Sequence, residues 1–257
     1  MENRDKHRFR FRKAGELRWV SHLDLARCFE RLLRRSRLPF RSSGGFHPMP
    51  RVVFAMALPL GAVSSREVVE IEFTETLEPG ETLDRLNEQT PPGLAFLDAR
   101  RVTPKTTAQP RRALFRFHLP DDAPRGLDAA VGELLDSPEV WVERVRPKRR
   151  RLNIRPYLRS IDISERHLDL DIWVTPAGSA RADELLRLLG LGDALADGRL
   201  LERIELELRD EVDPELTGDE PDLGKPQAVP IAPAPTEGGK STKRAEWGAS
   251  PSGPVVE

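Results

Sequence analysis

His22 is the first residue whose type and position could support chemistry. It follows Ser21, which can accept hydrogen bonds from the first amides of a helix, and Asp24 adds an acid three residues later, as in a capping box. Free amides and the positive end of the helix dipole would favour a bound anion there. In a ribonuclease, His22 would be the general base for a ribose 2′-hydroxyl, with Arg18 and Arg27 stabilising charge on phosphorus. The alternative is a histidine that only fixes the turn into the helix.

A second candidate site is the loop of residues 42–50, which reads SSGGFHPMP. Its two glycines could present backbone amides to a phosphate. Phe46 could stack on a base, and His47 beside it is the other candidate catalytic histidine. The loop lacks the lysine-serine ending of a P-loop, so nucleotide hydrolysis is not expected. The alternative is a plain structural connection.

The most basic segment is residues 144–159, which reads RVRPKRRRLNIRPYLR and holds eight cations and no acid. Clustered cations release counterions from a polyanion and an aromatic ring can stack on a base, so this segment predicts RNA binding. The alternative is a solvated loop whose charges pair with acids of the same protein. Over the whole chain, the predicted nucleic-acid contacts are Arg18, Arg27, Arg31, Arg34, Arg35, Phe46, Lys148, Arg149, Arg150, Arg151, Arg155 and Tyr157.

Cysteine and histidine usage argues against redox and metal chemistry. Cys28 is the only cysteine in 257 residues, and one thiol can neither form an intramolecular disulfide nor hold an iron–sulfur cluster alone. The five histidines show no metal-ligand spacing. We therefore expect no metal site, no cofactor and no catalysis beyond what His22 or His47 could perform.

The chain also carries no membrane or secretion signal of the usual kinds. No segment approaches the roughly 18 apolar residues of a membrane-spanning helix, and the N-terminal segment MENRDKHRFRFRK lacks the apolar stretch of a secretory signal. We therefore expect a cytoplasmic protein without a membrane partner.

The charge is unevenly distributed along the chain. The formal net charge is −1, from 41 Lys and Arg against 42 Asp and Glu, but residues 1–60 carry fourteen cations and five acids. Acids gather instead in residues 65–90 and 202–222. This asymmetry predicts a basic surface that an anionic partner can contact.

Apolar periodicity divides residues 1–102 into strands and helices in the order βαββαβ. Strands are predicted at residues 7–12, 52–58, 67–73 and 94–102, and helices at 21–35 and 79–89. The first helix has its leucines on one side and its arginines on the other. This order predicts a ferredoxin-like half, in which helices cover one face of an antiparallel sheet and the other face is open.

The same pattern roughly recurs after a predicted linker at residues 103–110. Strands are predicted at 113–119, 139–145, 158–163, 167–174 and 201–208, and helices at 126–136 and 181–189, with the basic segment as an interrupting loop. We therefore predict an α+β protein of two ferredoxin-like halves with antiparallel sheets, at residues 1–102 and 111–209. Residues 210–257 lose the periodicity and are rich in proline and glycine, which predicts a disordered C-terminal tail.

Several of these motifs together resemble the radical-SAM-associated protein family, a domain of unknown function. They are the segments RWVSHLD at residues 18–24, GFHPMP at 45–50, LPLG at 58–61 and RPY at 155–157. The resemblance covers roughly residues 7–210. It implies a domain fused to, or encoded beside, cobalamin-binding radical SAM enzymes, with an RNA-related accessory role. This chain has no Cys-x-x-x-Cys-x-x-Cys segment, so radical chemistry would belong to a separate protein.

The predicted fold and the helix that begins SHLDL are also distantly similar to CRISPR RNA-processing proteins with paired ferredoxin-like domains. That similarity is an analogy of fold, which does not fix function. The favoured function is an accessory module that binds RNA or presents a substrate and works with a separate radical SAM enzyme. One alternative is a metal-independent endoribonuclease that uses a histidine. The other is a protein-binding scaffold without RNA affinity.

Overall fold

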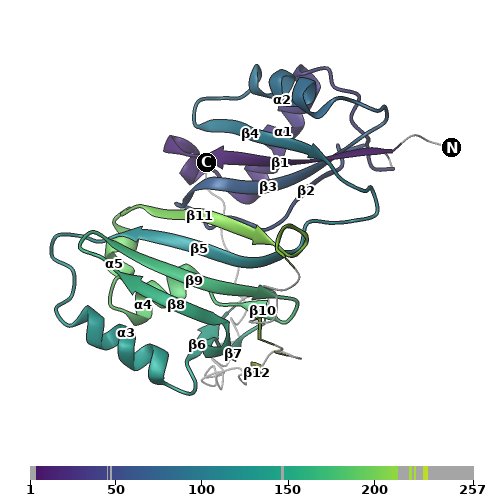
Figure 1. The fold of residues 1–257 in the computed structure, drawn as a ribbon. Helices are drawn as coiled ribbons and strands as arrows, with labels where there is room; N and C mark the ends of the chain where they lie inside the picture. Colours follow the sequence, from purple (N-terminus) through teal and green to yellow (C-terminus); the bar gives the residue numbers. More distant parts are fainter. Residues whose placement is uncertain are drawn as a thin grey trace, which may run out of the picture.

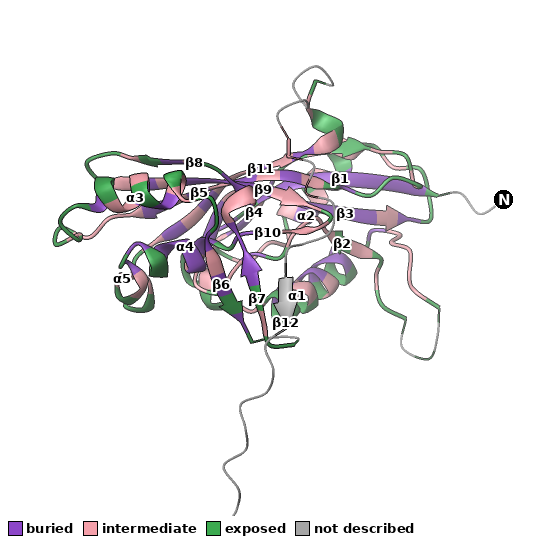
Figure 2. Cartoon of the chain, turned by 90° about the horizontal axis from the view of Figure 1, so that it is seen from below, coloured by how far each residue is buried: buried purple, intermediate pink, exposed green. Residues whose placement is uncertain are grey.

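The protein has a mixed α+β fold in which helices pack on one face of a large, mostly antiparallel sheet (Figures 1 and 2). The computed structural model describes residues 4–44, 46, 48–145, 148–213, 220, 221, 223 and 228–230. The predicted α+β class is confirmed at this level.

The elements of the N-terminal part alternate as the periodicity predicts. They are β1 (Asp5–Lys13), the 3-10 helix η1 (Gly15–Trp19), α1 (His22–Arg35), β2 (Val52–Phe54), β3 (Val63–Phe73), α2 (Pro79–Asn87) and β4 (Leu94–Arg101). Strand β2 is shorter than the predicted strand at 52–58, and β3 begins four residues before the predicted strand at 67–73.

The rest of the described chain contains more elements than the periodicity predicts. They are β5 (Pro110–His118), α3 (Leu127–Asp136), β6 (Trp141–Arg144), β7 (Arg150–Asn153), η2 (Arg155–Tyr157), β8 (Leu158–Ile163), β9 (His167–Thr175), β10 (Gly178–Ser179), α4 (Ala182–Leu188), α5 (Gly192–Ala196), β11 (Leu201–Leu208), η3 (Arg209–Glu211) and β12 (Ala228–Pro230).

Strands from both parts of the chain belong to one sheet. Its order is β10-β9-β5-β11-β3-β1-β4, with β2 also paired to β3 and β8 to β9. Strand β11 joins the two parts by a short parallel pairing with β3, where Glu202 lies beside Val63 and Arg203 beside Ser64. The sheet therefore runs without interruption from β4 to β8 (Figure 1).

Two apolar clusters hold the helices against the sheet. In the first, Phe9 and Phe11 of β1 pack with Phe29 of α1, as the alternation of β1 predicts. In the second, Phe115 and Phe117 of β5 pack among residues of α3, α4 and β9. Alternation along β1 and β5 sends the residues between these phenylalanines to the opposite, open face of the sheet.

The basic segment is not the simple loop predicted from its charge. Residues Arg150–Asn153 form β7, which pairs with β6 and with β12 in a separate three-stranded sheet. Part of the predicted tail is also structured, because η3 includes Asp210 and β12 lies at residues 228–230. Residues 214–219, 222, 224–227 and 231–257 of the predicted tail lie outside the described part of the chain.

The open face of the sheet is covered with arginine–carboxylate pairs. Arg8 of β1 contacts Glu70 of β3 at 2.9 Å, and Arg116 of β5 contacts Asp169 of β9 at 2.7 Å. Further pairs on or beside this face are Arg112–Asp171, Arg112–Glu207, Arg159–Asp171 and Lys6–Glu70. These pairs neutralise most of the cations that the strands present.

Two carboxylates beyond β11 complete this network. Asp210 lies 2.8 Å from a guanidinium nitrogen of Arg8, and Glu211 pairs with Arg10 and with Arg100. The segment that follows β11 is thus held across the open face by the arginines of β1 and β4. Arg8 and Arg10 of β1 are therefore not available to a polyanion, whereas Arg12 on the same strand is exposed.

The junction between β3 and β11 contains a fully buried ion pair. Arg203 is 0 % exposed, and its guanidinium donates to both carboxylate oxygens of Glu67 and to the carbonyls of Met56 and Ala57. This pair links the two parts of the sheet beneath the helices.

Replacing Arg203 with methionine is expected to lower the free energy of unfolding by about 3–5 kcal/mol, because Glu67 would remain as a buried charge without its partner. Guanidinium-induced unfolding followed by circular dichroism measures the change. Arg66→Met is the control, since Arg66 is half exposed and its ion pairs are 3.6 and 3.9 Å long. We expect that control to lose less than about 1 kcal/mol, and equal losses in both variants would contradict the account.

Candidate anion-binding pocket

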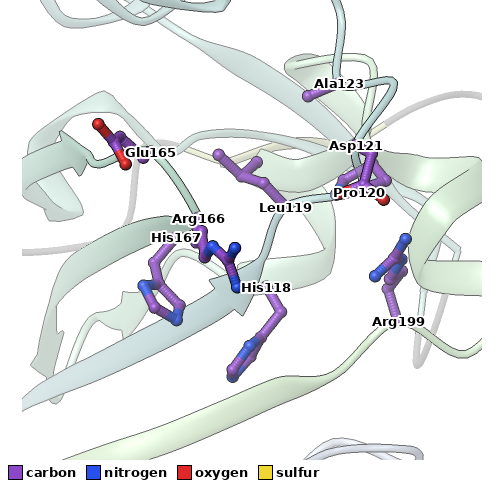
Figure 3. A pocket seen from close by; sticks show the side chains of 9 residues that line it. All are labelled: His118, Leu119, Pro120, Asp121, Ala123, Glu165, Arg166, His167 and Arg199. Carbon is purple, nitrogen blue, oxygen red and sulfur yellow. The ribbon is translucent and has the colours of Figure 1, made fainter.

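Two histidines face each other at the end of the open face. His118 is the last residue of β5, His167 is the first of β9, and the two are register partners in the antiparallel pair. Their ring centroids lie 4.8 Å apart with an interplanar angle of 79° (Figure 3). Both side chains are half-buried and line a surface pocket of about 870 Å³.

Local backbone bonds fix the positions of both histidines. The His118 amide donates to the Leu200 carbonyl at 3.0 Å, which ties β5 to the start of β11. In the turn before β9, the amide of Ser164 donates to the His167 carbonyl, and the Ser164 hydroxyl accepts from the His167 amide. Phe117 and Leu168, the neighbours on each strand, are fully buried in the core, so the two imidazoles must point to the open face.

Two exposed arginines enter the same pocket from different loops. Arg166 precedes His167 in the β8–β9 turn, and its carbonyl accepts the Leu119 amide at 2.9 Å. Arg199 lies in the turn between α5 and β11 (Figure 3). Neither arginine forms an ion pair with a residue that the structure describes, although Asp121 and Glu165 also line the pocket.

This lack of pairing sets Arg166 and Arg199 apart from the arginines of β5, which pair with carboxylates. Arg116 lies two residues before His118 on β5, and it donates to both oxygens of Asp169 at 2.8 and 2.7 Å. The neighbouring arginines on the sheet thus have carboxylate partners, whereas Arg166 and Arg199 leave donors free to bind an anion. Guanidinium groups bind phosphate or carboxylate through paired, charge-assisted hydrogen bonds.

The surroundings of His118 keep its imidazole neutral near pH 7. Burial lowers the pKa of His118, and the adjacent His167 lowers it further. Glu202 acts in the opposite direction, while Arg116 and Arg199 also lower the pKa. A neutral imidazole can accept a proton or a hydrogen bond from a ligand.

The described residues contain no group of three or more His, Cys, Asp and Glu side chains placed to hold a metal ion. The pocket offers imidazole nitrogens and guanidinium donors. Groups of these kinds can bind an oxyanion and exchange a proton with it.

His22 has no second catalytic group beside it among the described residues, and the structure gives it surroundings of another kind. Ser21 caps α1 as predicted, accepting from the Asp24 amide at 3.1 Å. The exposed His22 ring packs edge-on against Phe54 at 5.1 Å between centroids. Arg27 pairs with Asp24 on the same helix, so its charge is shared locally.

The other predicted contacts on α1 and in the loop after it are surface residues. Arg31, Arg34 and Arg35 are exposed, and Arg34 pairs with Glu30 at 2.9 Å. Phe46 is fully exposed. His47, the second predicted catalytic histidine, lies outside the described residues.

The basic segment divides into exposed and structural residues. Lys148, Arg149 and Arg151 are exposed, although Arg149 pairs with Glu143 at 2.5 Å and Arg151 lies over the Trp141 ring. Arg150 is half-buried.

Two predicted contacts in this segment have structural positions. Arg155 donates to the Leu135 carbonyl at the end of α3. Tyr157 is 2 % exposed and packs in the second core cluster, so its ring presents no face to a base.

The predicted cationic contacts do not meet in one place. In Figure 1, α1 lies over the part of the sheet near β4, and the β6–β7 hairpin lies beyond β8 at the other end. Arg18 is the exception that approaches the pocket, because it donates to the carbonyl of Gly198, the residue before Arg199, at 3.3 Å. Its guanidinium also lies 4.5 Å from the centroid of the half-exposed Trp19 ring.

The pair of His118 and His167 was missed at the level of sequence. Each residue lies at the edge of a predicted strand, 113–119 and 167–174, where alternation alone assigns it to an open face. Only the register of β5 against β9 brings the two together, and that register is set by the buried Phe117 and Leu168.

These features define an α+β protein with an open, arginine-lined pocket where β5 ends and β9 begins. The chain belongs to the family described as "Uncharacterized protein conserved in bacteria (DUF2344)", whose model matches residues 6–186. That description mentions neither radical SAM enzymes nor CRISPR proteins, so both resemblances stay predictions. None of the described helices is long and apolar enough to cross a membrane.

Other comparisons add no functional information. No curated protein matches the chain. A crystal structure described as an unknown protein from Galdieria sulphuraria is similar at 11 % identity, over 80 % of this chain and 99 % of that chain, with a TM-score of 0.27. A score this low carries no argument about the fold.

Replacing His167 with alanine is expected to raise the pKa of His118, because repulsion from the neighbouring imidazolium disappears. Proton NMR of the His118 ring over a pH series measures the change. In the unaltered protein the His118 pKa should lie below its value in the unfolded chain, about 6.5. The unfolded chain then binds the proton first, so His118 lowers stability as pH falls below that value. An equal or lower His118 pKa in the variant would contradict the arrangement.

Proposed function

We propose that the protein is an RNA-binding accessory module whose pocket holds a phosphate of the RNA backbone. The observation that carries the proposal is that Arg166 and Arg199 both line the pocket and neither forms an ion pair with a described residue. Their guanidinium groups therefore have donors available to an external anion at the point where the two imidazoles also lie.

The shape and chemistry of the site favour a backbone phosphate over an isolated small anion. The pocket of about 870 Å³ is open and larger than one phosphate group needs. Arg18 and the half-exposed Trp19 lie beside Gly198, next in the chain to Arg199, and add a cation and an aromatic surface. Aromatic surfaces beside cations are typical of sites for single-stranded nucleic acid.

Cations farther from the pocket are candidate outer contacts for a longer RNA. Arg31 and Arg35 on α1 and Lys148 at the β6–β7 hairpin are exposed. They lie over different parts of the sheet, so they would contact separate segments of RNA. Such contacts add affinity without sequence information.

The strand orders support the inference that the protein consists of two ferredoxin-like halves. The run β4-β1-β3-β2 and the run β11-β5-β9-β8 have the same relative order. A helix follows the strand that comes first along the chain in each run, α1 after β1 and α3 after β5. The β6–β7 hairpin is then an insertion between α3 and β8. In this reading the His118–His167 pocket lies at the end of the central strands of the second half.

The accessory role follows from the resemblance to the radical-SAM-associated family. With a single cysteine, the chain needs a separate enzyme for radical chemistry. We infer that this protein would bind the RNA while that enzyme modifies it.

A second candidate function is a scaffold that binds a protein partner without RNA. It is favoured by a groove of about 460 Å³ between residues 56–60 and 179–183, beside the exposed Leu60. Under this alternative, Leu60→Asp would weaken the complex with a radical SAM partner in size-exclusion chromatography, and the pocket variants below would leave that complex intact.

Combining Arg166→Ala with Arg199→Ala is expected to weaken binding to a fluorescein-labelled single-stranded RNA and to flatten its salt dependence. The plot of log K against log salt has a negative slope, and loss of two phosphate contacts should reduce the magnitude of that slope by about 1.4. Fluorescence anisotropy over a salt series measures both effects.

The matched control is the double variant Arg66→Ala and Arg101→Ala. It removes the same charge from two half-exposed arginines that already have carboxylate partners. The proposal requires the control to bind RNA nearly as the unaltered protein does. Equal weakening by the two double variants, or no RNA affinity in the unaltered protein, would refute it.

A further inference from the structure

Arg166 and Arg199 supply the positive charge that binding a phosphate requires. The facing imidazoles of His118 and His167 are not needed for binding alone, so they could have a further role. Two imidazoles within reach of one phosphate can act as a general base and a general acid. We propose that His118 and His167 catalyse metal-independent cleavage of the bound RNA strand, an activity that rests on the proposed function.

The reaction needs no reagent beyond the RNA and the two side chains. Neutral His118 takes the proton of a ribose 2′-hydroxyl, and the 2′-oxygen forms a bond to the adjacent phosphorus. The bond from phosphorus to the 5′-oxygen of the next nucleotide breaks. Protonated His167 gives its proton to that oxygen. The products are a 2′,3′-cyclic phosphate and a 5′-hydroxyl, and exchange with water restores both imidazoles.

The geometry of the pair is compatible with His118 as the general base and His167 as the general acid. The ring centroids are 4.8 Å apart and both rings line the same pocket, which in the proposal places both imidazoles beside one phosphodiester. They come from neighbouring strands anchored by the buried Phe117 and Leu168, which fixes the spacing. Arg166 and Arg199 can stabilise the negative charge that grows on the phosphorus oxygens.

The charges around the pair favour a neutral imidazole at His118, the proposed base. Besides His167 on β9, His118 is near Arg116 on its own strand, Glu202 on β11 and Arg199 in the preceding turn. Burial and the three cationic neighbours favour the neutral form of His118. A reaction that needs one unprotonated and one protonated imidazole should rise and then fall in rate as the pH increases.

This assignment differs from the predicted roles of His22 and His47. His22 lies on α1 against Phe54, and its nearby cation Arg27 is paired with Asp24. The structure brings no second imidazole to it among the described residues. The pocket offers the pair of imidazoles that the reaction requires.

The test is cleavage of the fluorescein-labelled single-stranded RNA in EDTA, resolved on denaturing gels. We expect fragments that end in a 2′,3′-cyclic phosphate, no cleavage of DNA of the same sequence, and a rate at least about 100-fold lower in His118→Ala and in His167→Ala. Both positions are half-buried at the sheet end, and thermal unfolding checks that the variants fold. Arg101→Ala, prepared in the same way, should cleave like the unaltered protein and shows that a substitution outside the pocket leaves the activity intact. A contaminating nuclease would instead leave cleavage unchanged in the two histidine variants.

The possible failures can be told apart by measuring anisotropy on the same RNA. RNA that binds but stays intact overturns the catalytic proposal and leaves the proposed function standing. RNA that does not bind overturns both. Cleavage that persists in the double variant His118→Ala and His167→Ala, or that disappears in His22→Ala alone, assigns the activity elsewhere and also overturns the proposal.

Discussion

The pairing of arginine with carboxylate is the interaction on which the rest of the structure depends. A guanidinium removed from water is tolerated only where an acid and hydrogen-bond acceptors compensate it. Arg203 meets that condition through Glu67 at the junction of β3 and β11, and Arg8 meets it through Glu70 and Asp210 on the open face. An arginine-rich sheet can therefore form without a large unbalanced charge.

The same constraint makes the His118–His167 pocket conspicuous. On the open face, acids of β3, β9 and β11 and of the segment after β11 pair with arginines such as Arg8, Arg112 and Arg116. At the end of β5 this compensation stops, and Arg166 and Arg199 enter a pocket with two imidazoles instead. The difference lies in local pairing, so neither the net charge nor the density of arginine along the chain reveals it.

Much of the fold could be predicted from the sequence, because it depends on local alternation. The period-two pattern around Phe9 and Phe11 and the cap at Ser21 predict β1 and the start of α1 correctly. Strand β7 was missed because its arginines hide the alternation, and β12 because three residues within a proline-rich segment carry no periodic signal.

The site was harder to predict, because its residues meet only through long-range pairing. Cationic clusters in the sequence indicated α1 and the basic segment, yet the ion partners of Arg8 and Arg10 lie about 200 residues away along the chain. His118 and His167 come together through the register of two strands, which the sequence does not specify without knowing which residues are buried. Tyr157 shows the opposite kind of error. Its place in a basic segment predicted contact with RNA, but its side chain is buried in the core.

The most direct test of the account is a crystal structure of the protein soaked with a ribonucleoside 3′-monophosphate. The account predicts a phosphate bound by the guanidinium groups of Arg166 and Arg199, with one of its oxygens within hydrogen-bond distance of His118 or His167. A phosphate bound instead along α1 or the β6–β7 hairpin, with the pocket still empty at saturating nucleotide, would contradict it.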